Sequence, residues 1–227
     1  MSADTQKIVV PGGLLVAVEG IDGAGKSTQV RALGERLRGA GLEVVQTHEP
    51  TGGKWGQLLR ASAQTGRFSP EEELNLFLKD RKEHVEALLR PSLAAGKVVL
   101  VDRYYFSTAA YQGPRGFDVA ELLRRNEAFA PRPDLLVLLE LEPKEGLGRV
   151  GARGDKANAF EREESLAQSA QVFRALRSEH YVGAEGDFIL ALDARQPSEE
   201  VTRQVLARVG ALLRAKPWAT GAPDFGF

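Results

Sequence analysis

The sequence predicts an α/β fold in which one parallel sheet carries helices on both faces. Short apolar runs alternate along the chain with longer segments of helical periodicity, which is the pattern of strand-helix repeats. A glycine-rich loop follows the first apolar run directly, and its spacing is one that binds phosphate groups. With 227 residues, 43% of them hydrophobic, the chain suits one such domain, placed at residues 1–214.

Five apolar runs are predicted to be the strands of that sheet. They are nearly continuous stretches of Val and Leu, as expected where helices cover both faces of a parallel sheet. In chain order they are Leu14–Glu19, Glu43–Thr47, Val98–Asp102, Leu135–Leu141 and Phe188–Asp193.

The segments between these runs are predicted to be helices. One start carries a clear local signal, because Ser69 offers an N-cap, Pro70 suits the first helical position, and Glu72 completes a capping box. The acidic run Glu71–Glu73 is therefore interpreted as a helix start and not as a metal site. The predicted helices are Lys26–Ala40, Lys54–Ala63, Pro70–Ala95, Val119–Phe129, Pro143–Ala152, Arg162–Tyr181 and Pro197–Arg214.

Two segments fall outside these elements. Gly151–Ala159 is polar and contains glycines, so we predict a mobile loop between helices. The tail, residues 215–227, is rich in Pro and Gly. It either frays or docks through Trp218 and Phe227, and the sequence leaves both alternatives open.

Composition narrows the possible function classes. The formal charge of −1 shows no basic excess of the kind that a nucleic-acid or membrane surface requires. The absence of cysteine excludes disulfides and thiolate metal sites. The N-terminus lacks the pattern of a signal peptide, and no apolar run reaches membrane-spanning length. We therefore expect a cytoplasmic chain without nucleic-acid or membrane partners.

The glycine-rich loop, residues 20–27, matches the pattern G-x-x-x-x-G-K-[ST]. Its glycines allow backbone N–H groups to turn toward phosphates, while Lys26 reaches the β and γ oxygens and the Ser27 hydroxyl binds Mg²⁺. The alternative is an ordinary glycine-rich turn, but a strand before and a helix after the loop favour the phosphate site. The residues predicted to bind ATP here are Gly20, Gly23, Ala24, Gly25, Lys26, Ser27 and Thr28.

Asp102 ends a buried strand, at the edge where ligands bind in open α/β sheets. From that position its carboxylate can hold Mg²⁺ through water, although it can also be an ordinary cap of the following turn. Arg103 comes next and reaches the same crevice, which favours the functional interpretation. The chain lacks an Asn-Lys-x-Asp stretch, so a small-molecule kinase is favoured over a GTPase-type switch.

Several motifs together are more specific than the loop alone. They are VEGIDGAGKSTQ (18–29), HEPTGG (48–53), LFLKDRKEH (76–84), VDRYYFSTAAYQG (101–113), PDLLVLLEL (133–141), AFEREESL (159–166) and LDARQP (192–197). In this order they resemble the thymidylate kinase family. The resemblance implies a P-loop kinase fold with a five-stranded parallel sheet and a lid at about residues 149–162. It also implies Mg²⁺-dependent transfer of the γ-phosphoryl group of ATP to dTMP, usually by a homodimer.

The resemblance assigns roles in the acceptor site. Asp22 matches an acid that accepts a hydrogen bond from the sugar 3′-OH. Phe77 matches the aromatic residue that stacks on thymine, and Arg81, four residues later on the same helix face, matches the arginine that reaches its carbonyl oxygen. From the residues alone, Phe77 can equally be a core residue and Arg81 a solvated charge.

Further acceptor residues follow from the same match. Arg103 matches the arginine beside the acceptor phosphate and Glu49 belongs to the same site, while Ser107, Tyr111 and Gln112 match the lining of the nucleoside pocket. The Gln112 amide is suited to reading a pyrimidine edge, whereas Tyr111 can also be a packing residue. Because a phosphate acceptor is already an oxyanion, no general base is needed. His84 and His180 are therefore interpreted as helix-surface or packing residues.

Gly23 stands where some family members carry an arginine, so the chain resembles the bacterial type, which places its catalytic arginines on the lid. The lid candidates are Arg149, Arg153 and Arg162, with Arg153 as the first choice. The adenine is expected after the last strand, at Ala194, Arg195 and Gln196.

Two departures from the family pattern bear on these roles. His48 replaces an arginine expected near the acceptor phosphate, and Asn158-Ala159 replaces a common Asp-Arg pair. Lys54 and Lys156 are the residues suggested to compensate. The alternatives left open are a kinase for another pyrimidine monophosphate and a nucleotide-binding regulator without turnover.

Overall fold

The computed structural model is described for residues 7–65, 68–151, 156–177 and 188–227, excluding the side chains of 63–65 and 156–162. Its strands form one five-stranded sheet in the order β2-β3-β1-β4-β5, and each pairing between neighbours is parallel. The strands are β1 (Leu14–Glu19), β2 (Val44–His48), β3 (Val98–Asp102), β4 (Leu135–Glu140) and β5 (Ile189–Asp193). The predicted fold class and all five strands are confirmed, with ends that shift by one residue at most.

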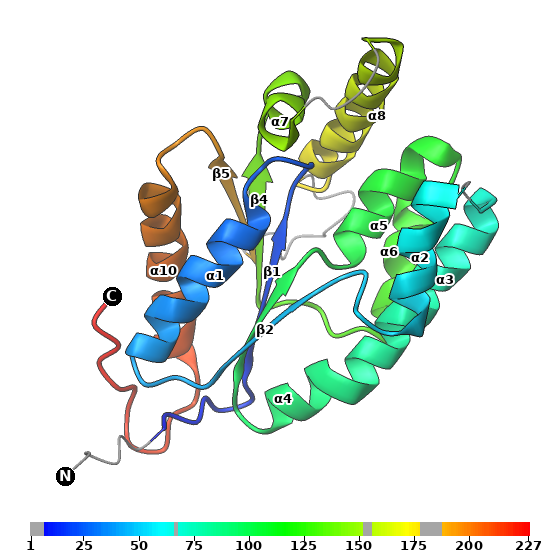
Figure 1. Cartoon of the computed structure of the whole chain (residues 1–227). Coiled ribbons are helices and arrows are strands. Elements are labelled where there is room, and N and C mark those ends of the chain that lie inside the picture. Colours follow the sequence, from blue (N-terminus) through cyan, green and yellow to red (C-terminus); the bar gives the residue numbers. More distant parts are fainter. Residues whose placement is uncertain (1–6, 66–67, 152–155, 178–187) are drawn as a thin grey trace.

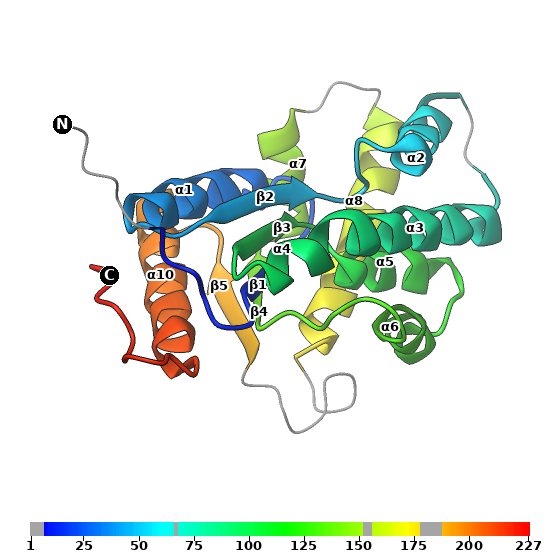
Figure 2. The same cartoon turned by 90° about the horizontal axis from the view of Figure 1, so that it is seen from below.

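Helices cover both faces of this sheet. Helices α1 and α10 pack against each other on one face, and α4 packs against β3 on the other, beside α3 and α5 (Figures 1 and 2). The described helices are α1 (Lys26–Gly39), α2 (Lys54–Thr65), α3 (Pro70–His84), α4 (Arg90–Ala94), α5 (Tyr105–Gln112), α6 (Val119–Glu127), α7 (Pro143–Val150), α8 (Lys156–Ala175) and α10 (Ser198–Ala215).

The order of the strands decides where a ligand can bind. The central strand β1 pairs with β3 on one side and β4 on the other, so the chain leaves β1 at the point where the connections change direction. Ligands in open α/β sheets bind in the crevice at this point, beyond the carboxyl ends of the strands. The buried core of β1, β3 and β4 therefore fixes the place of the loop at residues 20–27.

The long helix predicted over Pro70–Ala95 is present but not uniform. It runs as α3, a π-helical turn at Val85–Leu89, and α4. Pro91 has no N–H to donate to the preceding turn, which accounts for the locally wider winding. The predicted capping box at Ser69 is confirmed, with both of its reciprocal hydrogen bonds to Glu72.

The secondary structure differs from the prediction in two places. Helix α5 was not predicted, because Tyr105–Gln112 is short and its own N-cap, Tyr104, has no capping side chain. Helix α8 begins at Lys156, six residues before the predicted start, so the predicted loop Gly151–Ala159 does not extend to its end. Ala, Lys and Glu are good helix formers, and they fill this first part of α8.

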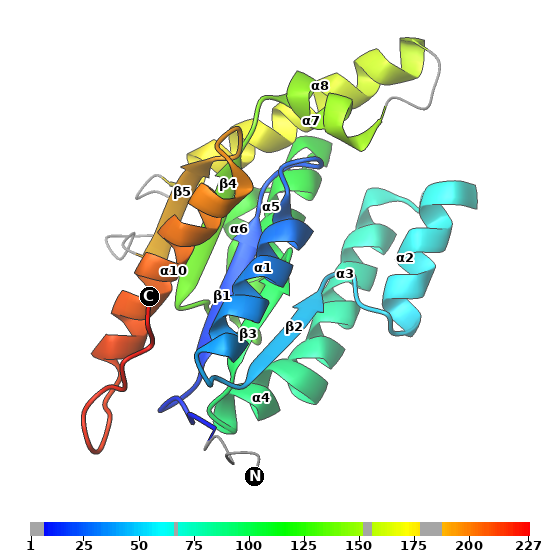
Figure 3. The same cartoon turned by 60° about the vertical axis from the view of Figure 1, so that its left-hand side comes forward.

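The C-terminal tail docks and does not fray. The indole Nε1 of Trp218 donates to the Leu213 carbonyl at 2.7 Å, and Phe225 is buried beside it with ring centroids 6.0 Å apart. Lys216 forms an ion pair with Asp134 at 2.9 Å. The tail therefore packs along the end of α10 (Figure 3). Within the described part of the chain, no helix is both long and apolar enough to cross a membrane.

Candidate active site

The loop at residues 20–27 joins β1 to α1 and surrounds its lysine. Gly25 precedes α1 with φ of +93°, a conformation that suits glycine. The Lys26 side chain is buried, and its Nζ donates to the Ile21 carbonyl at 2.9 Å. Burial, together with the nearby charge of Arg103, lowers the pKa of Lys26 to about 8. The loop thus holds a partly desolvated ammonium group where phosphates are expected.

Gly23 has a structural reason to lack a side chain. Its φ is +83°, and a Cβ atom there would lie 2.3 Å from the carbonyl oxygen of Gly146 in α7. A Cβ atom on Gly146 would in turn lie 2.5 Å from the Asp22 carbonyl. This close approach of two backbones sets α7 against the phosphate loop, and an arginine at position 23 would separate them.

A groove of about 390 Å³ runs from the phosphate loop toward the loop after β5. Arg149 of α7 spans it, with Nη1 lying 3.4 Å from the Gly23 carbonyl and 3.1 Å from that of Ala194. The residues that line the groove are Gly23, Ala24, Gly25, Thr28, Gln29, Leu139, Arg149, Ala194, Gln196, Ser198 and Val201.

Arg195, which was predicted to bind ATP, does not line this groove. Its guanidinium instead makes three hydrogen bonds to the carboxylate of Asp193, at 2.9, 3.1 and 2.8 Å. These bonds hold the pKa of Asp193 down at about 2. Its neighbours Ala194 and Gln196, expected in the same place, do line the groove.

The predicted metal ligands lie together. The Ser27 hydroxyl, at the start of α1, donates to the Asp102 carboxylate at the end of β3. A hydroxyl and a carboxylate are hard oxygen donors, and Mg²⁺ commonly takes one or two such protein ligands and completes its shell with phosphates and water. No cluster of three or more metal-ligating side chains occurs in the described part of the chain. The pair therefore fits Mg²⁺ bound together with a nucleotide.

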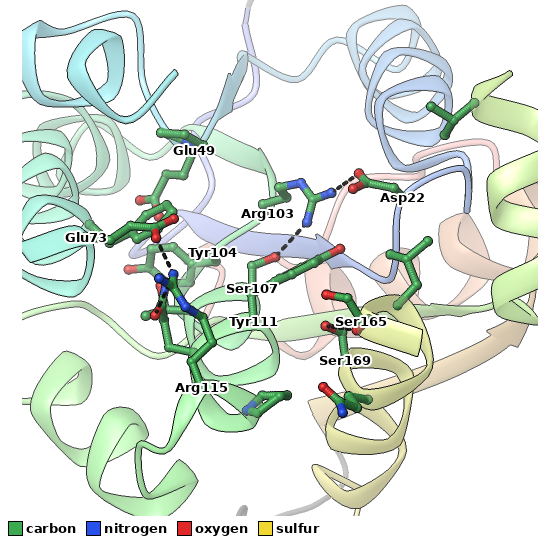
Figure 4. Close-up of a pocket in the computed structure, with 18 of the residues that line it drawn as sticks. Asp22, Glu49, Glu73, Arg103, Tyr104, Ser107, Tyr111, Arg115, Ser165 and Ser169 are labelled. Atoms are coloured by element: carbon green, nitrogen blue, oxygen red, sulfur yellow. Dashed lines mark hydrogen bonds and ion pairs between the residues drawn. The ribbon is translucent and has the colours of Figure 1, made fainter. Parts of the chain in front are cut away.

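Arg103 stands between the two halves of the crevice in a strained conformation. Its φ of +66° is uncommon for a residue other than glycine, and such conformations cluster at functional sites. The guanidinium binds the Asp22 carboxylate and the Ser107 hydroxyl, the latter at 3.2 Å, and lies 5.3 Å from the centre of the Tyr111 ring (Figure 4). Four predicted site residues thus form one cluster.

Glu19 is a site residue that the sequence reasoning missed. It ends β1, is completely buried, and accepts hydrogen bonds from the backbone N–H groups of Tyr104 and Ser107 at 2.7 and 3.0 Å. The Ser107 hydroxyl donates to its second oxygen at 2.6 Å. The carboxylate thereby caps α5, which lacks a cap of its own. Burial raises the pKa of Glu19. The sequence signal that could have identified Glu19 is an acidic residue at the end of an otherwise apolar strand. The same signal identified Asp102.

A cavity of about 610 Å³ lies beside Arg103. Asp22, Phe77 and Gln112 are among its walls, and Ser165 and Ser169 line it from α8 (Figure 4). The complete lining is Asp22, Glu49, Pro50, Glu73, Phe77, Arg81, Arg103, Tyr104, Ser107, Thr108, Tyr111, Gln112, Pro114, Arg115, Leu147, Val150, Gly151, Ser165, Leu166, Gln168 and Ser169. All eight residues predicted to bind the acceptor are in this list.

The surroundings of Phe77 and Arg81 bear on the two alternatives left open for them. Phe77 is half-buried and lines the cavity, and it is not part of the hydrophobic core of the described residues. Arg81 is 2% exposed, so it is not a solvated charge. Its guanidinium binds Glu49 at 2.6 Å, Asn126 at 2.6 Å and Thr108 at 3.1 Å.

His84 extends this buried network, so of the two positions expected for it, helix surface or packing, the packing position is the one found. Its Nδ1 lies 2.9 Å from the Glu49 carboxylate, and its Nε2 lies 2.8 Å from the Thr47 hydroxyl. Glu49 thus binds Arg81 and His84 together and joins the end of β2 to α3. A single residue pattern cannot reveal such a network, because its members are 32 and 35 positions apart.

His48 ends β2 at the surface, with its Nδ1 2.9 Å from the Pro50 carbonyl. It lines a second groove together with Ser27, Asp102 and Arg103, which is the region expected for the acceptor phosphate. Lys54, suggested to compensate, lies over the Trp55 ring at 4.6 Å and lines neither this groove nor the acceptor cavity.

Several residues of the predicted lid, and His180, lie outside the described part of the structure or have no described side chain. Arg153 and His180 belong to undescribed segments. Residues 156–162 are described as helix, but their side chains are not, which applies to Lys156, Asn158, Ala159 and Arg162.

Comparison with known proteins agrees with this geometry. The family model described as "Thymidylate kinase" matches residues 18–205. A thymidylate kinase of Xylella fastidiosa (strain M12) is 48% identical over 94% of this chain and 94% of its own length. The thymidylate kinase of Xanthomonas euvesicatoria pv. vesicatoria (strain 85-10) is 53% identical over 89% of this chain and 86% of its own. The chain belongs to the thymidylate kinase family.

Proposed function

We propose that this chain transfers the γ-phosphoryl group of ATP to dTMP, giving ADP and dTDP. The observation that carries the proposal is the position of the acceptor cavity. It holds an aromatic side chain, Phe77, and a buried arginine, Arg81, and it meets the phosphate loop at Arg103. A nucleoside monophosphate seated there would bring its phosphate to the γ-phosphate of a nucleotide in the loop.

The chemistry needs positioning and positive charge more than proton transfer. An oxygen of the acceptor phosphate attacks the γ-phosphorus, and the bond from that phosphorus to the bridging oxygen of the leaving ADP breaks. The backbone N–H groups of the loop and Lys26 neutralise the transferring group, while Arg103 orients the acceptor phosphate. Because the acceptor oxygen carries no proton at neutral pH, no general base takes part.

Ser27 and Asp102 would hold Mg²⁺ together with the phosphates. Its charge would help to neutralise the negative charge that develops on the leaving group. Arg149 is the described lid arginine nearest the loop, and its two carbonyl contacts leave it donors for the nucleotide phosphates. A catalytic role for Arg153 stays a prediction, as do the homodimer and the cytoplasmic location.

Asp22 has a role in this scheme that agrees with its contacts. Its Oδ1 is bound by Arg103, and its side chain is 57% exposed toward the crevice. We propose that Oδ2 accepts a hydrogen bond from the 3′-OH of the acceptor. Asp22→Asn should then lose more activity with dTMP than with its 3′-deoxy analogue. Equal losses on both substrates would mean that Asp22 acts only through Arg103.

A coupled assay of ADP release across a panel of monophosphates tests the function directly. We expect dTMP to give the highest kcat/KM, with dUMP, dCMP, CMP and AMP lower. A preference for another monophosphate would reject the substrate assignment. Binding of ATP without turnover of any acceptor would instead support a nucleotide-binding regulator.

A further inference from the structure

A charged pair lies at one side of the acceptor cavity. Glu73, in the first turn of α3, forms an ion pair with Arg115, in the 3-10 turn Gly113–Arg115 that follows α5 (Figure 4). Both residues line the cavity, and only 23% of the Arg115 side chain and 12% of the Glu73 side chain are exposed. Such a partly desolvated pair fixes its members more firmly than a surface salt bridge does.

Arg115 also fixes the orientation of Gln112. An Nη1 N–H of Arg115 donates to Oε1 of Gln112 at 3.3 Å. A guanidinium has donors and no acceptor, so the amide atom that faces it must be the oxygen. Gln112 is 2% exposed and lines the same cavity. Its NH₂ group is therefore turned away from Arg115 and is left to donate to a ligand.

Another polar group that lines the cavity is also a donor. Arg81 lines the cavity, and its guanidinium is held by Glu49, Asn126 and Thr108. Because Arg81 cannot accept a hydrogen bond, a base placed between it and Gln112 meets N–H groups from both. Carbonyl groups on the base satisfy these donors, whereas an amino group does not.

We propose that Glu73 and Arg115 are positioning residues that select the acceptor base through the amide of Gln112. Held with its NH₂ group toward the ligand, Gln112 binds a pyrimidine with a carbonyl group at C4. The 4-amino group of cytosine would place donor against donor and leave both unpaired, which is costly in a buried site. This inference rests on the proposed function and adds the chemical origin of its base specificity.

The first test removes Arg115. In Arg115→Ala the side-chain amide of Gln112 is free to flip, so its oxygen and its NH₂ group can exchange places. The value of kcat/KM should therefore fall for substrates with a 4-carbonyl group. We expect kcat/KM for dTMP to fall about tenfold, the effect of one hydrogen bond of this kind, and kcat/KM for dCMP to stay or rise. If Arg115 merely ties α3 to the turn, both values fall together, and an unchanged dTMP to dCMP ratio would overturn the proposal.

The second test reverses the pair. In the double variant Glu73→Arg/Arg115→Glu an ion pair is kept, but the group beside Gln112 becomes an acceptor. The amide should then present its NH₂ group to position 115 and its carbonyl oxygen to the ligand. We expect the ratio of kcat/KM for dCMP to that for dTMP to rise at least tenfold over the wild-type chain. A ratio equal to that of the wild-type chain would contradict the proposal.

A matched control and the wild-type chain separate the possible failures. Arg124→Ala removes an exposed ion pair with Glu121 on α6, away from the cavity lining, and should leave the ratio unchanged. A wild-type chain that does not phosphorylate dTMP rejects the proposed function itself. A wild-type chain that prefers dTMP, with variants that keep its preference, rejects only the role of Glu73 and Arg115.

Discussion

The acceptor cavity and the phosphate-loop groove lie at the same edge of one sheet but are supported differently. In the cavity, Arg81 and Arg103 each bind a carboxylate, so their positions are set before any ligand arrives. Among the described residues, Arg149 of the groove hydrogen-bonds only to backbone carbonyls, and Lys26 of the adjoining phosphate loop donates to one. The comparison teaches that the proposed acceptor side is pre-organised by paired charges, whereas the cations of the proposed donor side are not paired with carboxylates among the described residues and suit the phosphates of ATP.

The largest effect is expected on the donor side. Lys26→Ala removes the ammonium group that neutralises the transferring phosphoryl group, and kcat should fall by about 10³-fold or more. Steady-state kinetics measures the loss, and circular dichroism shows whether the fold is intact. A folded variant with near-normal kcat would break the comparison, because the cation of the phosphate loop would then not be needed for phosphoryl transfer.

On the acceptor side, Glu49→Gln tests the paired charges. The substitution leaves Arg81 buried without its carboxylate, which costs about 3–5 kcal/mol of unfolding free energy. The KM for dTMP should rise while the KM for ATP changes little. Unfolding in urea and steady-state kinetics measure the two effects.

The control for that variant is Glu200→Gln, which breaks an exposed ion pair with Arg203 on α10 and should change neither quantity. If Glu49→Gln raised the KM for ATP as much as that for dTMP, the two regions would not be independent.

A smaller effect is expected from Phe77→Ala, which tests the part of the acceptor cavity that is proposed to bind the base. An aromatic side chain that stacks on a base contributes about 1–3 kcal/mol, so the KM for dTMP should rise roughly tenfold to a hundredfold. The value of kcat should change little, because stacking stabilises ground and transition states alike. A variant that loses stability instead, as seen by thermal unfolding, would return Phe77 to the role of a core residue.

The smallest effect concerns pH. Because the pKa of Lys26 is lowered to about 8, the ammonium form predominates below that pH and the neutral amine above it. Affinity of the free chain for ATP should therefore decline above about pH 8, approaching tenfold per unit once the amine predominates. Titration calorimetry at several pH values measures this, and the decline should be absent in Lys26→Ala. An equal decline in the affinity for dTMP over the same pH range would mean that Lys26 acts on both regions.

The sequence was a good guide wherever a feature is local. Buried strands appear as apolar runs, the capping box at Ser69 is four residues long, and the phosphate loop is one contiguous motif. Features that depend on long-range contacts were missed. Helix α5 is capped by Glu19, which lies 85 positions before Tyr104, and His84 is buried only because Glu49 and Thr47 lie beside it.

The site itself divides in the same way. The eight residues that the family motifs predicted for the acceptor site all line the cavity, but the motifs did not point to Glu73 and Arg115 in the same lining, nor did they show that Gly23 is required by the approach of Gly146. They also suggested Arg195 for the donor site, whereas its guanidinium is engaged by Asp193, a pairing formed within the turn that follows β5. A motif shows which residue types are present, but the fold decides which partner each side chain binds.

The central claim is that the acceptor cavity is formed independently of the donor site. Calorimetric titration of dTMP into Lys26→Ala, without ATP, tests it most directly, because this variant should have lost turnover but kept the cavity. We predict a Kd for dTMP within about threefold of the wild-type value, a free-energy difference below about 0.7 kcal/mol. Loss of dTMP binding in the folded variant would contradict the account and show that the two regions act as a single site.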